Sequence, residues 1–136
     1  MLPEITREWL QKADEHYGFA SSSMEFTDYF GQICFHFQQA AEKYLKAFII
    51  SNKLNFRPVH NLLELLAICK KYDPEIKQLE QACHFLNPFY IDSRYPVHWP
   101  TAYDKNTALS AKKMVEEIRD YILKSLANDK HKDKKI

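Results

Sequence analysis

The chain has very little glycine and little proline, with 2 and 6 of them among 136 residues. A sheet of many short strands needs frequent turn residues, so this scarcity argues against an all-β fold and favours long helices. Hydrophobic residues make up 46% of the chain, which is enough for one core. We therefore expect an all-α fold, an up-and-down bundle of four to five helices, as a single domain over residues 1–127. Residues 128–136 are expected to be a basic, disordered tail.

Cysteine is also scarce, and the three residues Cys34, Cys69 and Cys83 are odd in number and widely spaced. No C-x-x-C pair is present, which argues against a disulfide framework or a cysteine zinc site and favours free, buried thiols. Long apolar runs are missing as well, so no membrane span is expected. Residues 1–20 carry charges throughout, unlike a secretory signal peptide. We expect a cytoplasmic protein with no membrane partner.

A strong excess of one charge is absent too, because the net charge is only +1. Residues 130–136 hold four lysines against one aspartate, a net charge of +3, so the rest of the chain carries −2. A nearly neutral body is not typical of a protein that coats nucleic acid electrostatically. The basic tail is interpreted as a solvated end, with attraction to phosphate as the alternative.

What the chain does have is a helical segment, Cys34–Ala47, that is apolar around most of its circumference. Such a helix belongs at the centre of a bundle. It nevertheless carries His, Gln, Glu and Lys within the apolar run, and unpaired polar groups are costly to bury, at about 1–3 kcal/mol each. The segment therefore predicts a central helix with a polar network beside it.

Capping residues and apolar spacing predict where the helices begin and end. Proline is placed at a helix start and near a helix stop. The expected helices run from a cap at Thr6 to about Ser21–Ser23, from Thr27 or Asp28 to about Ile50, from Asn61 to about Tyr72, from Asp73 to near Pro88, and from Asp104 to a frayed end after Leu126.

Besides the polar network of Cys34–Ala47, a second candidate site is the segment Arg94–Trp99. It follows the fourth helix and contains arginine, tyrosine, histidine and tryptophan. His98 could take the proton of a ribose 2′-hydroxyl, and Arg94 could stabilise negative charge on phosphorus, so RNA cleavage without a metal is one interpretation. Tyr90, Tyr95 and Trp99 offer rings on which unpaired bases could stack. The alternative is a structural role, with Arg94 paired to Asp92 and the aromatic rings covering the end of the bundle.

Two histidines and two lysines are open to the same two kinds of interpretation. A metal site needs three or four convergent ligands, and neither His36 nor His60 belongs to a helical ligand pair, so structural histidines are one interpretation and no metal is expected. Glu42, Lys43 and Lys46 have the spacing of a solvated helix edge. Because Lys43 and Lys46 lie three residues apart, they could instead face a phosphate together.

Three segments together resemble a known family: Cys34–Ala47, His60–Leu63, and Tyr90-Ile91-Asp92-Ser93-Arg94-Tyr95-Pro96. The chain resembles HEPN domains, small all-helical proteins associated with nucleotide binding, over about residues 5–125. The resemblance implies a homodimer, often encoded beside a minimal nucleotidyltransferase. Many relatives are metal-independent ribonucleases that act as toxins, with the nucleotidyltransferase as antitoxin.

The family's ribonucleases carry an arginine, four to six residues, and then a histidine. Arg94 matches the arginine, whereas His98 follows after only three residues. Pro100 stands where some family toxins have a tyrosine, and His60-Asn61 replaces the usual His-Asp. The predicted catalytic residues are therefore Arg94 and His98, with no cofactor. The predicted nucleotide-binding residues are Tyr90, Tyr95, Lys43, Lys46, His36 and His60.

The resulting functional hypothesis is a HEPN protein of a toxin–antitoxin-like nucleotidyltransferase pair. Its cleft around the Arg-Tyr-Pro loop would face a nucleotide or single-stranded RNA and would cleave RNA without a metal. The alternative hypothesis is a module that binds a nucleotide or another protein and catalyses nothing. The short Arg94–His98 spacing and the nearly neutral body favour this alternative.

Overall fold

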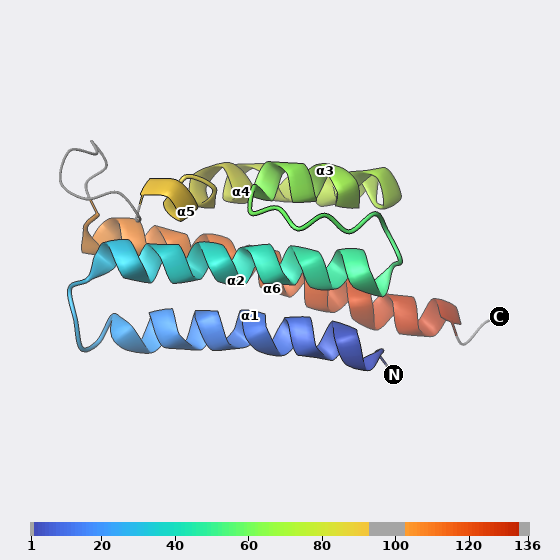
Figure 1. The fold of residues 1–136 in the computed structure, drawn as a ribbon, viewed down its shortest axis with the longest axis horizontal. Coiled ribbons are helices and arrows are strands. Elements are labelled where there is room, and N and C mark those ends of the chain that lie inside the picture. Colours follow the sequence, from blue (N-terminus) through green and yellow to red (C-terminus); the bar gives the residue numbers. More distant parts are fainter. Residues whose placement is uncertain (1, 93–102, 134–136) are drawn as a thin grey trace.

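The protein is described by a computed structural model that covers residues 2–92 and 103–133. These residues form helices and no strand, which confirms the all-α prediction (Figure 1). The elements are α1 (Glu4–Ser23), α2 (Phe30–Ser51), α3 (Leu62–Tyr72), the 3-10 helix η1 (Pro74–Leu79), α4 (Glu80–Leu86), α5 (Phe89–Asp92) and α6 (Lys105–Asp133).

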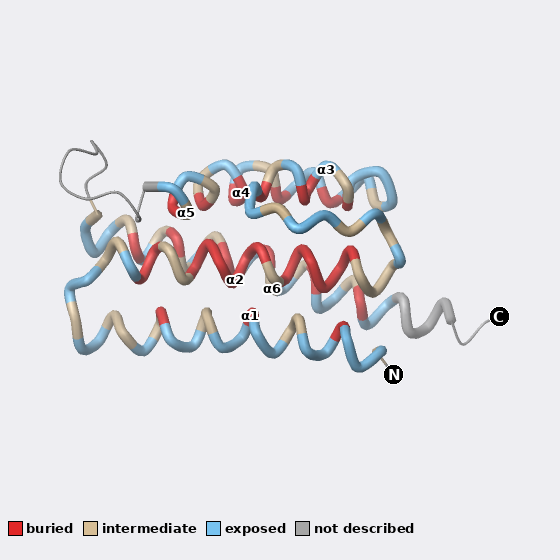
Figure 2. The backbone as a smooth tube through the Cα atoms, in the orientation of Figure 1, coloured by how far each residue is buried: buried red, intermediate tan, exposed pale blue. Residues whose placement is uncertain are grey.

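Helix α2 is the central member of the bundle, as its apolar circumference predicts. It packs against α1 on one side, against α3 to α5 on another, and against α6 (Figure 1). Figure 2 shows buried backbone over most of α2, whereas the other helices alternate buried and exposed positions. The largest fully buried side chains include Ile33, Phe37, Tyr44, Leu45, Phe48, Leu62, Leu65, Ile118 and Ile122.

The first two predicted caps are wrong. Helix α1 begins at Glu4, directly after Pro3, so Thr6 lies inside the first turn, fully buried, with no hydrogen-bond partner for its hydroxyl. Helix α2 begins at Phe30 without a side-chain cap. The hydroxyl of Thr27 instead donates to the carbonyl of Ser23 at 3.3 Å, in the connection after α1. Ser and Thr side chains form such local bonds readily, which is why the type of residue alone does not locate a helix start.

The later helix starts agree with the prediction. The carboxylate of Asp73 accepts from the backbone N–H of Glu75, and that of Asp104 accepts from the N–H of Thr107 at 2.8 Å. The predicted fourth helix is divided, because its first half is the 3-10 helix η1 and its second half is α4. Helix α6 continues to Asp133, beyond the end expected near Leu126.

Asn61 caps α3 as predicted, and its effect on stability can be tested. Its side-chain oxygen accepts from the backbone N–H groups of Leu63 at 2.9 Å and Glu64 at 3.2 Å. We expect Asn61→Ala to lower the free energy of unfolding by about 1 kcal/mol, since those two donors lose their acceptor. Urea denaturation measures the change. Asn61→Asp, which keeps an acceptor oxygen, should recover most of the loss, and failure to do so would contradict the capping role.

The remaining structural expectations concern cysteine and the membrane. Cys34, Cys69 and Cys83 are free and buried, as predicted, and burial raises the pKa of each thiol to about 12. None of the helices within the described ranges has both the length and the apolar character that crossing a bilayer requires.

Candidate functional site

The predicted polar network of α2 is present and is more deeply buried than its spacing suggests. Gln38, Gln39, Glu42 and Lys46 are all buried, with Glu42 2% exposed and Lys46 5% exposed. The interpretation of Glu42 and Lys46 as a solvated helix edge is therefore wrong. These side chains are covered by residues from other segments, which spacing along α2 cannot show.

Glu42 is the centre of this network. One carboxylate oxygen accepts from the Nζ of Lys46 at 2.9 Å. The other lies 3.0 Å from the Nδ1 of His60 and also accepts from the amide of Gln39 at 3.2 Å. A buried carboxylate requires such partners, because an isolated charge is very costly to remove from water.

Lys46 is enclosed on its other side by aromatic rings. Its Nζ lies 5.7 Å from the ring centroid of Trp9 and 5.8 Å from that of Phe56. Trp9 comes from α1 and Phe56 from the segment between α2 and α3. The charge of Lys46 is thus compensated inside the protein by Glu42 and by two ring faces.

His60 connects the network to the surface. Its side chain is 48% exposed, and its ring stacks on Tyr90 of α5 with centroids 4.3 Å apart and planes at 17°. The amide of Gln38 donates to the carbonyl of His60 at 3.0 Å, which fixes the backbone there. Phe35 stacks on Tyr90 from α2 at 6.0 Å. His60 is thus held by the buried carboxylate of Glu42, and its ring forms a partly exposed stack with Tyr90 and Phe35.

His36 has a partner that the sequence did not reveal. Its Nδ1 lies 2.9 Å from the Nδ1 of His16 on α1. Phe19 meets the His36 ring edge-on at 4.7 Å, and Phe35 at 5.4 Å. Burial, the charge of Lys43 and the facing His36 lower the pKa of His16 to about 4. Burial and Lys43 also lower the pKa of His36.

Lys43 is half-buried beside the histidine pair. Its Nζ donates to the side-chain oxygen of Gln39 at 3.0 Å. Burial lowers the pKa of Lys43, and the charges of Lys46 and Lys12 act in the same direction, whereas Glu42 opposes them. No ion pair of Lys43 with a carboxylate occurs among the described residues, so its charge is available to a ligand.

These residues form one continuous surface, which we call the histidine–aromatic strip. Ring contacts connect its members in order, from α1 across α2 to α5 and the segment before α3. The strip consists of His16, Phe19, His36, Phe35, Tyr90 and His60, with Lys43 beside it.

The structure brings four predicted site residues together on or beside the strip: His36, Lys43, His60 and Tyr90. Lys46 belongs to the same network but lies beneath the surface, on Glu42. Arg94, Tyr95 and His98 lie outside the described residues, as do Trp99 and Pro100. Tyr103, the first described residue after this segment, packs against α2 and α5. Its ring lies 3.5 Å from the position that a Cβ atom on Gly31 would take, and 5.9 Å from the ring of Phe89.

Sequence reasoning missed His16, Phe19 and Phe35 as site residues. His16 and Phe19 are three residues apart, on one face of α1, but the periodicity of the first helix predicts only a packing role. The single available signal was a polar ring among the apolar positions of that helix. As for metals, no group of three or more potential ligands occurs in the part of the chain that the structure describes.

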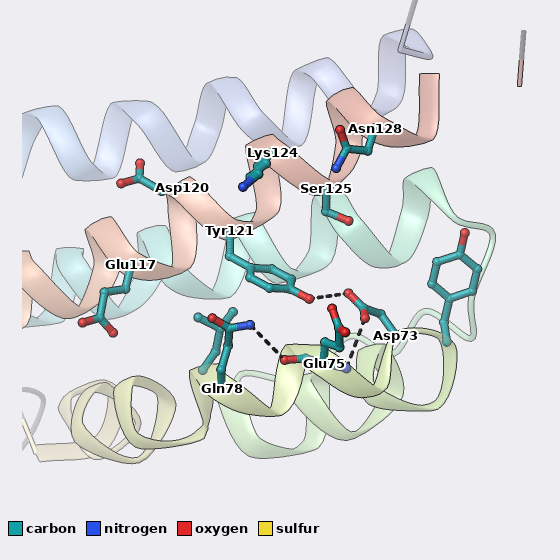
Figure 3. Close-up of a pocket in the computed structure, with 11 residues that line it drawn as sticks. Asp73, Glu75, Gln78, Glu117, Asp120, Tyr121, Lys124, Ser125 and Asn128 are labelled. Atoms are coloured by element: carbon teal, nitrogen blue, oxygen red, sulfur yellow. Dashed lines mark hydrogen bonds between the residues drawn. The ribbon is translucent and has the colours of Figure 1, made fainter. Parts of the chain in front are cut away.

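A cleft of about 900 Å³ lies elsewhere, between η1 and α6, and does not suit a nucleotide phosphate (Figure 3). Its lining includes the carboxylates of Asp73, Glu75, Glu117 and Asp120, and no residue of the strip lines it. Asp73 also accepts from the hydroxyl of Tyr121 at 2.5 Å. Burial and this carboxylate raise the pKa of Tyr121 above its usual value. An anionic ligand would be repelled here.

Comparison with known proteins supports the family resemblance. The HEPN domain family model matches residues 6–126. The solved structure of TT1696 from Thermus thermophilus is similar, with a TM-score of 0.78 and 28% identity, and the match covers 88% of this chain and 96% of that one. ST0689, an archaeal HEPN homologue, shares the fold with a TM-score of 0.72 at 24% identity, covering 89% of this chain and 97% of that one. No curated protein matches.

Proposed function

The chain belongs to the HEPN domain family, and on that premise we propose that it binds a nucleotide or single-stranded RNA along the histidine–aromatic strip. The observation that carries this proposal is the His60–Tyr90 stack, anchored on the buried carboxylate of Glu42. Stacked rings beside a cation are the usual means of holding unpaired bases and their phosphates. Lys43 supplies the cation, at one end of the same network.

In this proposal the parts of the strip have different tasks. The exposed half of the His60–Tyr90 pair offers a ring face for a base, while the network below fixes the orientation of His60. Every charge of the network except that of Lys43 is paired internally, so ring faces are the main contacts that the strip offers, and they suit a ligand whose bases are unpaired. This matches a single strand better than a duplex, whose bases are already stacked.

The stacking role of Tyr90 gives the first functional test. We expect Tyr90→Ala to weaken binding of a labelled single-stranded RNA by about 5- to 150-fold, since loss of one stacked base costs about 1–3 kcal/mol. Fluorescence anisotropy in EDTA measures the affinity. Tyr72→Ala is the matched control, because Tyr72 is a 47% exposed tyrosine beside the acidic cleft. Equal affinity of the Tyr90 and Tyr72 variants would contradict the assignment.

We further propose that the RNA is cleaved, without a metal, in the segment that follows Tyr90. In this mechanism His98 removes the proton of a ribose 2′-hydroxyl, whose oxygen then bonds to the adjacent phosphorus to give a 2′,3′-cyclic phosphate, while the bond from phosphorus to the 5′-oxygen of the next nucleotide breaks. The departing 5′-oxygen takes a proton from the protonated His98 or from water. Arg94 stabilises the charge that develops on the phosphate oxygens. Tyr95 adds a stacking surface. The family resemblance supports a homodimer in which two Arg94 segments meet, so that each site is built from both subunits.

The same resemblance supports a minimal nucleotidyltransferase as the partner, in a toxin–antitoxin-like pair. A non-catalytic interaction module is the second candidate, favoured by the Arg94–His98 spacing of three residues. Exposed apolar side chains between α1 and α2 also favour it, because Phe26 is 81% exposed and Tyr29 68% exposed. Such side chains mark a surface at which another protein can pack.

A further inference from the structure

The hydrogen bonds of Glu42 determine which nitrogen of His60 carries a proton. One carboxylate oxygen lies 2.9 Å from the ammonium of Lys46, and this buried ion pair favours the ionised form of Glu42. An ionised carboxylate accepts hydrogen bonds and donates none. The Nδ1 of His60, 3.0 Å from the other oxygen, must therefore carry a proton. In the neutral imidazole the Nε2 of His60 is then bare and is a hydrogen-bond acceptor.

The amide partner of Glu42 agrees with this placement of the proton. The side-chain oxygen of Gln39 accepts from the Nζ of Lys43 at 3.0 Å, so its amide nitrogen is the atom that faces Glu42 at 3.2 Å. The same nitrogen donates to the side-chain oxygen of Gln38 at 2.8 Å. Lys46 and Gln39 are thus donors to the carboxylate, and the Nδ1–H form of His60 completes the set.

The bare Nε2 lies on the exposed side of the ring. The two nitrogens of an imidazole point in different directions, so a ring that directs Nδ1 at a buried carboxylate directs Nε2 away from it. The side chain of His60 is 48% exposed, whereas that of Glu42 is 2% exposed. Within the described ranges the hydrogen bonds of His60 involve Nδ1 and the backbone carbonyl, and none involves Nε2. This acceptor is therefore left for a ligand.

The stacking contacts show how a nucleotide reaches this acceptor. His60 stacks on Tyr90 with planes at 17°, and Phe35 stacks on Tyr90 at 28°. No ring contact joins Phe35 to His60 in the described part of the chain, so His60 is at one end of this row of rings. A base that extends the row stacks on the outer face of His60. Its ribose is attached at the edge of the base and crosses the level of the neighbouring ring, so its 2′-hydroxyl can reach the edge that carries Nε2.

The group that meets Nε2 must be a hydrogen-bond donor. The phosphate and ether oxygens of a nucleic-acid backbone only accept, which excludes them. The N–H groups of a stacked base lie in a plane parallel to the imidazole, where a hydrogen bond to Nε2 is poorly directed. The 2′-hydroxyl is a donor that every ribonucleotide carries, whatever its base, and that DNA lacks.

We propose that the Nε2 of His60 accepts a hydrogen bond from the 2′-hydroxyl of a bound ribonucleotide, so that this histidine selects RNA over DNA. The inference rests on the proposed function and adds to it a residue that determines specificity. Glu42 is the positioning residue, because it holds the proton on Nδ1 and fixes the orientation of the ring. His60 transfers no proton, and His98 keeps its proposed role in cleavage.

The test compares single-stranded oligonucleotides of one base sequence that differ at the 2′-position. RNA offers a donor there, 2′-O-methyl RNA offers an acceptor only, and DNA offers neither. We expect the full chain to bind RNA about 2- to 12-fold more tightly than either analogue at pH 8 in EDTA, the range for one net hydrogen bond. Fluorescence anisotropy measures the affinities. If denaturing gels show that the RNA is cut, a 2′-amino oligonucleotide replaces it, because this probe keeps a donor and has no 2′-hydroxyl.

Two variants isolate the acceptor. His60→Phe keeps a ring beside Tyr90 and removes Nε2, so the preference for RNA over DNA should fall by the same factor. His60→Gln removes the ring and has an amide oxygen that can accept, so it should bind all probes more weakly and keep more of the preference. His84→Phe is the matched control, because His84 is an exposed histidine on α4, outside the strip. Its preference should equal that of the unmodified protein.

The proton on His60 can also be located directly in the unmodified protein. Imidazole ¹⁵N chemical shifts at pH 8 should show a protonated Nδ1 and a bare Nε2 for this residue. The reverse tautomer would overturn the proposal. Equal affinity for RNA and 2′-O-methyl RNA would also overturn it, because the two probes differ in the donor.

The outcomes separate this inference from the proposed function. If RNA binds, Tyr90→Ala weakens binding, and the preference for RNA is the same in His60→Phe and His84→Phe, the role of His60 is wrong and the proposed function stands. If none of the oligonucleotides binds, the proposed function is wrong as well.

Discussion

Glu42→Ala should lower the free energy of unfolding by about 3–5 kcal/mol, the largest effect expected of any single polar substitution in this chain. The substitution leaves the ammonium of Lys46 buried with no carboxylate at 2.9 Å, and an uncompensated buried charge is strongly destabilising. It also removes the oxygen that holds His60. Urea denaturation at pH 7, followed by circular dichroism, measures the change.

Two comparisons make this test specific. Glu80→Ala breaks an ion pair of similar length, 2.8 Å to Lys70, but both side chains are nearly half exposed. That variant should therefore lose far less stability than Glu42→Ala, because solvent screens an exposed pair. The double variant Glu42→Leu, Lys46→Met removes both charges and should recover most of the stability. If Glu42→Ala and Glu80→Ala had equally small effects, the buried network would not contribute as described.

Arg94→Ala and His98→Ala should each reduce RNA cleavage by about 10²- to 10⁴-fold, the range for loss of a general base or of a charge-stabilising group. The effect is large because the 2′-hydroxyl is a poor nucleophile until its proton is removed. Incubation of purified protein with total cellular RNA in EDTA measures the cleavage, and EDTA excludes cleavage by contaminating metal-dependent nucleases.

The control for this experiment is Arg7→Ala, which removes an exposed arginine on α1. It should leave cleavage unchanged, and all three variants should melt within a few degrees of the unmodified protein. Intact RNA in every lane would favour the non-catalytic module. Cleavage that survives in both Arg94→Ala and His98→Ala would show that other residues perform it.

The buried network holds the rings of the strip in fixed positions. A surface that stacks a base must hold its rings in place before the ligand arrives, because ordering side chains on binding costs affinity. In this protein Glu42 and Gln38 fix His60 from below, and His60 in turn orients Tyr90. On the proposed function, Glu42→Ala should therefore weaken RNA binding as well as lower the stability of the fold.

The fold class and several helix boundaries could be predicted from the amino-acid sequence alone. Scarce glycine, an apolar central helix and strong local signals such as Asn61 and Asp73 are sufficient for that, because capping and helical periodicity act within a few residues. The same local signals predicted caps at Thr6 and Thr27 that are wrong, because a threonine hydroxyl can form other local hydrogen bonds and does not by itself locate a helix start. The sequence also indicated a polar network on α2 and identified four residues of the strip region: His36, Lys43, His60 and Tyr90.

The contacts of those side chains could be found only in the folded chain. The pairing of His16 with His36 depends on how α1 and α2 are aligned against each other, and no spacing within one helix specifies that alignment. The burial of Lys46 depends on Trp9 and Phe56, which reach it from two other segments. The stack of His60 on Tyr90 joins α5 to the segment before α3. Helical periodicity is a local property, whereas a site is formed by contacts between elements, and those contacts are set by the packing of the whole bundle.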